Sequence, residues 1–138
     1  MRSMFLLLIV ASLVAVAAGC GGADGDTGAT ENAATYERQP TIMCLQEHGD
    51  VSTSSLDMIA EGAPGGGIRF ARDGQEAMLA FGRTPEDAER IRASYETFYE
   101  GMDAPADDIL FTRGNVAIAW TDTPTEEERA LVENCLRG

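Results

Sequence analysis

Residues 68–81 read IRFARDGQEAMLAF, and residues 109–120 read ILFTRGNVAIAW. The first five residues of the two segments align, with Ile, Phe and Arg at the first, third and fifth positions of both. Each segment leads into a Thr-Pro pair, at Thr84-Pro85 and Thr123-Pro124. The charged pair Glu89-Arg90 recurs as Glu128-Arg129. The chain therefore repeats one unit, which we interpret as a strand, a tight turn, a strand and a helix.

Two turn dipeptides set the expected strand pairing. Asp73-Gly74 is a strong hairpin signal, because glycine adopts positive φ without strain and Asp does so more readily than most residues. Gly114-Asn115 occupies the same place in the second copy. Centring the hairpins on these turns brings the large apolar side chains to one face of the sheet. The predicted opposite pairs are Phe70 with Ala77, Ile68 with Leu79, Phe111 with Ile118, and Ile109 with Trp120.

The Thr-Pro pairs predict the starts of two helices. Thr84-Pro85 offers an N-cap and a proline at the first helical position, and residues 123–126 (Thr-Pro-Thr-Glu) offer the same with a capping box. Apolar residues then recur every three or four positions, which predicts one core-facing stripe on each helix. The stripes comprise Ala88, Ile91, Tyr95, Phe98 and Met102 in the first helix and Leu131, Val132, Cys135 and Leu136 in the second.

These elements predict an α+β fold. A duplicated ββα unit gives a four-stranded antiparallel sheet in the order 68–72, 76–81, 116–121, 109–113, with both helices on one face. This order keeps the strand-helix-strand connections right-handed. The arrangement is ferredoxin-like and circularly permuted. Short N-terminal helices are expected at 41–48 and 55–61, with an edge strand at 51–53 between them.

One face of this sheet would be flat, small and mildly apolar. Contiguous apolar surface of this kind is usually covered, so it predicts either an interaction surface or a cover made by Leu56, Met58 and Ile59. The candidate interaction face comprises Ala71, Met78, Ala80, Leu110, Ala117 and Ala119.

Charge excludes one large class of function. The chain carries ten arginines, no lysine and 23 acidic residues, a formal charge of -13. Nucleic-acid binding needs clustered basic side chains, so no nucleic-acid partner is expected. The absence of lysine also excludes a lysine Schiff base and a P-loop lysine.

The N-terminus predicts export and anchoring. Arg2 precedes an apolar run from Phe5 to Ala18, which has the length of a signal-peptide core and is too short for a membrane span. The run ends in Ala17-Ala18-Gly19-Cys20, which resembles the lipobox of bacterial lipoproteins. The resemblance implies that residues 1–19 are removed and that Cys20 is lipidated, which places the protein on the extracytoplasmic face of the cell membrane. The alternative is an ordinary signal peptide with a chance cysteine.

Composition divides the rest of the chain in two. Residues 20–40 are rich in glycine and acids and poor in aliphatic bulk, which predicts a disordered tether behind the lipidated cysteine. Residues 41–138 are expected to form one α+β globular domain. An acidic domain on such a tether would be repelled by anionic headgroups rather than lie flat on them.

The two remaining cysteines, Cys44 and Cys135, are expected to form a disulfide. An even pair in an exported chain usually oxidises, and this one would close a loop of about 90 residues. The alternative is a redox or metal pair. No Cys-x-x-Cys motif accompanies that alternative, and His48 is the only imidazole.

From Cys44 onward the chain resembles a set of small, uncharacterised exported domains of high-GC bacteria. The resemblance rests on Cys44-Leu45, on residues 113–116 (Arg-Gly-Asn-Val) with Trp120, on Thr123-Pro124 and on the terminal Cys135-Leu136. It implies an exported fold and no particular activity.

Few residues suggest chemistry. Oxygen ligands of Glu100, Asp103, Asp107 and Asp108 could hold Ca²⁺, although EF-hand spacing is absent. His48 has Ser52, Ser54 and Ser55 nearby in sequence, yet no Gly-x-Ser-x-Gly elbow exists for a hydrolase. We therefore expect a non-enzymatic binding or interaction module without a cofactor, whose partner is an envelope protein. A cation- or small-ligand-binding sensor is the alternative, and a minor hydrolase using His48 is a remote one.

Overall fold

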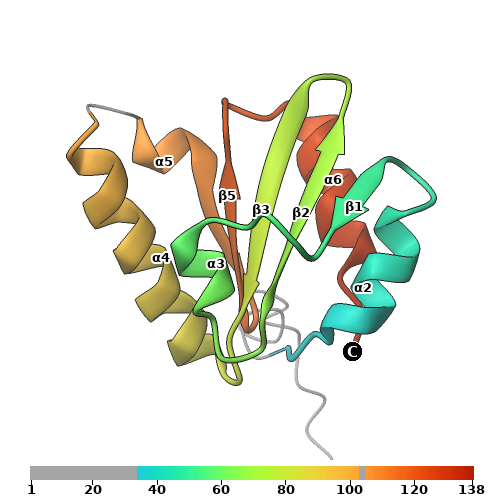
Figure 1. The fold of residues 1–138 in the computed structure, drawn as a ribbon, viewed down its shortest axis with the longest axis horizontal. Coiled ribbons are helices and arrows are strands. Elements are labelled where there is room, and N and C mark those ends of the chain that lie inside the picture. The colour runs from blue at the N-terminus through green and yellow to red at the C-terminus, as the bar shows by residue number, and fades with distance from the viewer. Residues whose placement is uncertain (1–33, 103–104) are drawn as a thin grey trace, which may run out of the picture.

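The computed structural model describes residues 34–102 and 105–138. The predicted signal peptide, Cys20, the first part of the predicted tether and Asp103 lie outside these ranges. In the described residues the helices are α2 (Arg38–Leu45), α3 (Met58–Glu61), α4 (Pro85–Glu100), α5 (Ala106–Ile109) and α6 (Glu126–Cys135). The strands are β1 (Asp50–Ser52), β2 (Gly67–Arg72), β3 (Gln75–Phe81), β4 (Leu110–Arg113) and β5 (Val116–Trp120). The fold is α+β, as predicted (Figure 1).

The sheet is antiparallel and has the order β1-β2-β3-β5-β4. The four strands β2-β3-β5-β4 follow the predicted order, and β1 adds the expected edge strand beside β2. The pairs Phe70–Ala77, Ile68–Leu79 and Phe111–Ile118 have the predicted register. Ile109 is not in a strand, because it ends the short helix α5. The hairpin turns decide the register here, with positive φ at Asp73, Gly74 and Gly114.

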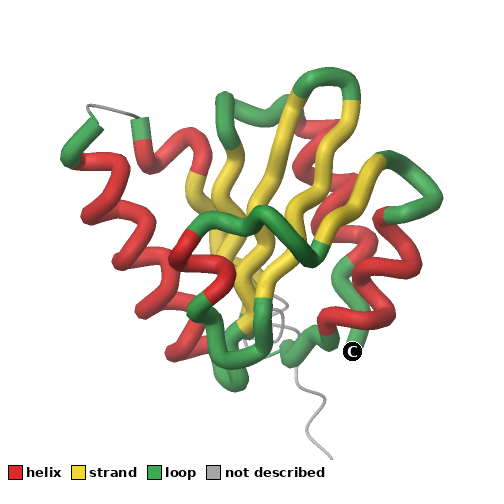
Figure 2. Tube along the Cα trace, in the orientation of Figure 1, coloured by secondary structure: helices red, strands yellow, loops and turns green. Residues whose placement is uncertain are grey.

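The two long helices lie on opposite faces of the sheet, so the ferredoxin-like arrangement with both helices on one face is wrong (Figure 1). Thr112 of β4 donates to Glu89 of α4 at 2.8 Å, which places α4 on the side of Thr112. The neighbouring Phe111 points the other way, and the Arg129 guanidinium of α6 lies 4.3 Å from its ring centroid. The strands therefore form a middle layer between two layers of helices (Figure 2).

The physical reason is that both faces of the sheet are apolar. The face with the bulky residues is covered by α2 and α6, and the flat face is covered by α4 and α3. The crossover rule constrains α4, which connects two parallel strands, but not α6, which no strand follows. Nothing local therefore prevents α6 from covering the face that α4 leaves open.

The predicted interaction face is consequently buried within the chain, and its assignment as an open surface is wrong. Ala80, Leu110, Ala117 and Ala119 are all buried, while Ala71 and Met78 are half-buried. Their contacts come mainly from α4, with α3 packing against β2 and β3. Of the residues expected to cover this face, Leu56 and Ile59 are half-buried and Met58 is exposed.

The stripe on α4 ends earlier than predicted. Ala88, Ile91 and Tyr95 are buried, but Phe98 and Met102 are exposed, and Tyr99 is half-buried instead. The 16 residues of α4 span about 24 Å, whereas the four residues of α3 span about 6 Å. The cover that α3 provides is therefore too short for the last turns of α4.

Both long helices begin with a threonine cap. Thr84 caps α4 as predicted, with its side chain accepting from the Asp87 amide. In α6 the cap is Thr125 rather than Thr123, and the capping box joins Thr125 to Glu128. The box lowers the pKa of Glu128, chiefly through the hydrogen bond from the Thr125 backbone.

The fold begins before the predicted boundary at residue 41, which lies inside α2. Tyr36 donates its backbone N–H to Asn115 Oδ1 at 2.6 Å, and Asn115 Nδ2 donates back to the Tyr36 carbonyl at 3.0 Å. The backbone N–H of Glu37 donates to the Arg137 carbonyl at 2.6 Å. The chain therefore enters the domain at the end of the sheet that holds the β4–β5 turn and the C-terminus.

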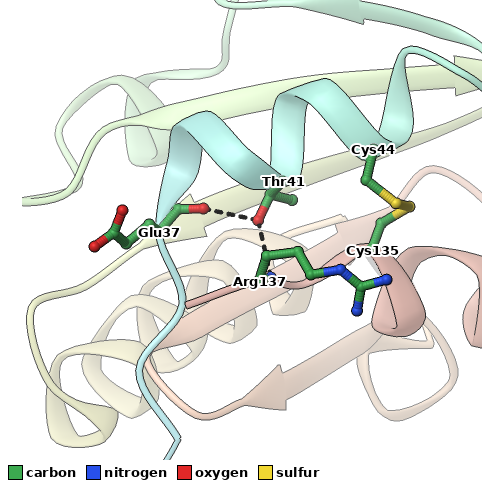
Figure 3. The surroundings of a disulfide bond; sticks show 5 residues. All are labelled: Glu37, Thr41, Cys44, Cys135 and Arg137. Atoms are coloured by element: carbon green, nitrogen blue, oxygen red, sulfur yellow. Dashed lines mark hydrogen bonds between the residues drawn. A yellow bond between two sulfur atoms is a disulfide. The ribbon is translucent and has the colours of Figure 1, made fainter.

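The predicted disulfide joins α2 to α6, with an S–S distance of 2.04 Å (Figure 3). One turn before Cys44, the Thr41 hydroxyl donates to the Glu37 carbonyl at 2.8 Å and accepts from the Arg137 amide at 3.4 Å. Covalent and polar contacts thus hold both ends of α2 against the C-terminal residues. No helix in the described ranges has the length and apolar character needed to cross a bilayer.

Candidate functional site

The predicted cation loop does not converge on a site in the part of the chain that the structure describes. The Asp107 side chain is 98% exposed, and its nearest charged partner is Arg92 at 3.7 Å. Glu100 and Asp108 are also exposed, and Asp103 lies outside the described residues. Within those residues, no three carboxylates bring oxygen atoms within 4.8 Å of one another. An arginine beside the loop further disfavours a bound cation.

His48 is not assembled into a catalytic triad. It lies exposed just after α2. The Ser52 hydroxyl bonds instead within its own turn, to the Ser54 carbonyl at 2.8 Å and the Ser54 hydroxyl at 3.1 Å. Among the described residues, no hydrogen bond between a serine and the His48 ring is found, so the geometry offers no activated nucleophile there.

A groove lined mainly by apolar side chains lies between α3 and α4. Its volume is about 440 Å³, within the size range of ligand sites but open to solvent. Met58 and Ile59 form one wall, Ile91 of α4 belongs to the other, and Ala63 and Pro64 also line the groove. The polar part of its lining comes from three residues of α4, namely Asp87, Arg90 and Ser94. A smaller hollow continues from Met58 and Ile59 to Phe98 and Tyr99. We call this combined surface the α3–α4 groove.

Two large apolar side chains are exposed at this groove. Met58 is 81% exposed and Phe98 is 55% exposed. Both line the smaller hollow, and Phe98 packs edge-on against Tyr99 with 5.6 Å between ring centroids. Exposed apolar groups that gather at one place mark contact surfaces, whereas isolated ones do not.

Asp57 positions the two walls of the groove. Its carboxylate caps α3 by accepting from the Ile59 and Ala60 amides, at 3.0 and 2.7 Å. The same carboxylate accepts from the Tyr95 hydroxyl of α4, at 2.9 and 3.0 Å. Burial, reinforced by the Asp57 charge, raises the pKa of both Tyr95 and Tyr99. Tyr95 therefore remains a neutral donor at physiological pH, and it fixes α3 on α4.

We expect Asp57→Ala to lower the free energy of unfolding by about 2–3 kcal/mol. The change removes a helix cap, worth about 1 kcal/mol, and leaves the Tyr95 hydroxyl buried without its acceptor. Denaturant unfolding measures the loss. Asp107→Ala is the matched control, since that carboxylate is exposed, and it should change stability by less than about 0.5 kcal/mol. Equal losses in the two variants would contradict the role assigned to Asp57.

The apolar pattern of the sequence missed the groove for an identifiable reason. Phe98 continues the three- and four-residue spacing of α4, so the pattern places it in the core. The signal that could have found the groove is length, because the short helix expected at 55–61 is much shorter than the apolar stripe that runs from Ala88 to Met102. A long amphipathic helix beside a short cover leaves apolar surface exposed.

No family model, no curated protein and no solved structure matches this chain.

Proposed function

We propose that this protein is a non-enzymatic interaction module that binds a basic segment of an envelope protein in the α3–α4 groove. The observation that carries the proposal is the exposure of Met58 and Phe98, side by side, on a domain that buries most of its other large apolar side chains. Interface cores are enriched in aromatic residues and methionine, which are the types found here.

Charge around the groove favours a basic partner. Asp57, α3 and α4 carry seven carboxylates against two arginines. Arg90 and Asp87 both line the groove and pair with each other, and Arg92 pairs with Glu96. The excess acids on the two helices therefore give this side of the domain a negative potential. A segment with lysines or arginines flanking an apolar side chain would complement both the charge and the hollow beside Phe98. Acidic residues would also steer such a partner toward this face.

Titration with two synthetic peptides tests the proposal. One peptide is an amphipathic lysine–leucine sequence, and the other has each lysine replaced by glutamate. We expect only the basic peptide to bind, with amide chemical-shift changes concentrated in residues 57–63 and 87–99. Phe98→Ser should weaken binding at least tenfold while leaving stability nearly unchanged, because the side chain is already exposed.

Met43→Ser is the matched control. Met43 is 63% exposed on α2, across the sheet from the groove, and its removal deletes equivalent apolar surface elsewhere. Binding should be unaffected by this variant. If Phe98→Ser and Met43→Ser weaken binding equally, or if neither does, the peptide is held by net charge alone and the groove proposal fails.

We further propose that a lipid on Cys20 anchors the module at the extracytoplasmic face of the cell membrane. The support is the lipobox-like sequence 17–20, together with the glycine-rich segment that follows it. The chain enters the domain beside the β4–β5 turn, so an anchor would hold that end of the sheet nearest the membrane. Labelled palmitate should appear in the protein and disappear in Cys20→Ser. Persistent label in that variant would refute the anchor without affecting the groove proposal.

A further inference from the structure

Three metal-binding side chains meet where α2 and α6 end. The Sγ atoms of Cys44 and Cys135 and a ring nitrogen of His48 all lie within 4.8 Å of one another. Within residues 34–102 and 105–138, no other set of three His, Cys, Asp or Glu side chains comes this close. The disulfide occupies two of these ligands in the oxidised protein, and the proposed function does not use them.

Local structure explains why His48 joins the cysteines. Beyond Leu45 the chain continues in helical turns. The backbone N–H of Glu47 donates to the Cys44 carbonyl at 3.2 Å, and the backbone N–H of His48 donates to the Leu45 carbonyl at 2.9 Å. Residues four apart lie on the same side of such turns, which brings His48 next to Cys44. Cys135 arrives from the last residue of α6. The three ligands therefore come from α2, from the turn that follows it and from the end of α6.

The cluster is accessible from one side. Cys135 is 2% exposed, Cys44 is half-buried and His48 is exposed. A reducing thiolate can therefore approach Cys44, and a cation can reach the cluster past the His48 ring. The strongly negative net charge raises the local concentration of cations near the surface.

We propose that the reduced protein binds one divalent cation of the zinc class through Cys44, Cys135 and His48. Two thiolates and an imidazole are a soft ligand set that suits Zn²⁺. Tetrahedral zinc bonds of about 2.0–2.3 Å place ligand atoms about 3.6–3.8 Å apart, which fits inside the observed cluster. The Cα atoms of the two cysteines are 5.4 Å apart, so the sulfur atoms can separate by side-chain rotation. Water would take the fourth position at the exposed edge.

The redox step balances with a dithiol reductant. The reductant forms its own disulfide and gives up two electrons and two protons, while the Cys44–Cys135 bond breaks and each sulfur takes one proton. Cation binding then displaces these two protons to solvent, because thiolates are the ligands. The bound cation would hold α2 on α6 in place of the covalent bond.

Cobalt titration of the reduced protein, with reductant removed under anaerobic conditions, tests the proposal. Co²⁺ substitutes for Zn²⁺ and gives a thiolate charge-transfer absorption that reports sulfur ligation. We expect saturation at one equivalent, displacement by Zn²⁺, and no such absorption in the oxidised protein. His48→Ala should weaken Zn²⁺ binding at least tenfold, whereas Gln46→Ala, which changes an exposed neighbour on the same turn, should not.

A second measurement covers the case in which reduction unfolds the chain. Near-ultraviolet circular dichroism of the reduced protein should then regain the signal of the folded state on adding one equivalent of Zn²⁺. Equal affinities in wild type and His48→Ala would overturn the proposal, because unstructured thiols would then account for the binding. Failure of Zn²⁺ either to bind the folded reduced protein or to refold the unfolded one would also overturn it.

Discussion

Replacing both Cys44 and Cys135 with serine is expected to lower the free energy of unfolding by about 4–5 kcal/mol. The disulfide links residues 91 apart, so its loss frees a long loop in the unfolded chain. Chain entropy assigns a stabilisation of about 4.7 kcal/mol to a loop of roughly 100 residues. Most small domains have a free energy of unfolding of about 5–15 kcal/mol, so this single bond would supply a large share of that free energy.

Urea unfolding of the oxidised wild type and the double variant measures this loss. The matched control is Cys20→Ser, which changes a cysteine outside the pair and should leave the domain stability unchanged. Reduced wild type in the presence of a metal chelator should behave like the double variant, because both lack the same cross-link. A loss below about 1 kcal/mol would show that the α2–α6 contacts hold without the bond.

Asn115→Ala is expected to cost about 3 kcal/mol. The Asn115 side chain, in a residue 2% exposed, donates to the carbonyls of Tyr36 and Gly82, at 3.0 and 2.8 Å, and accepts from the Tyr36 amide at 2.6 Å. Alanine would leave these backbone groups without their partner in a largely buried place. Each lost bond is worth about 1 kcal/mol, and unsatisfied buried groups add to the cost.

The loss should be accompanied by release of the N-terminal segment. Asn115 and Glu37 hold residues 34–37 on the domain, so proteolysis before α2 should accelerate in Asn115→Ala. Asn134→Ala, at an exposed position of α6, is the matched control and should change stability by less than about 0.5 kcal/mol. If both variants have the same stability, the clamp on the N-terminal segment is not a stabilising contact.

Short-range features were predictable because neighbouring residues encode them. The turn at Asp73-Gly74 needs positive φ at both positions, and both positions have it. Once the turn is placed, the alternation of side chains determines the register, because a slip of one residue would exchange the two faces. The Thr84 cap was predictable from the adjacent proline, which also acts locally. The pairing of Cys44 with Cys135 followed instead from the number of cysteines.

The candidate site was less predictable because it depends on which elements of the fold pack over α4 and which surface they leave exposed. Apolar spacing assigns Phe98 to the core, and only the short length of α3 leaves it exposed. The role of Asn115 was hidden in a different way, since a turn dipeptide explains its presence without the contact to Tyr36. His48 joins the cysteines only because α6 ends beside α2.

The sequence by itself determined the strands, their order and most of their register, the starts of the two long helices within two residues, and the cysteine pairing. The strands and helix starts depend on turn chemistry and side-chain alternation, which are local properties of the sequence. The cysteine pairing follows by elimination from the number of cysteines. Only the tertiary structure decided that α4 and α6 lie on opposite faces. The apolar stripe of a helix indicates that this side of the helix is buried, but it does not indicate against which face of the sheet. Because both faces of this sheet are apolar, covering each of them with a helix removes the most apolar surface from water.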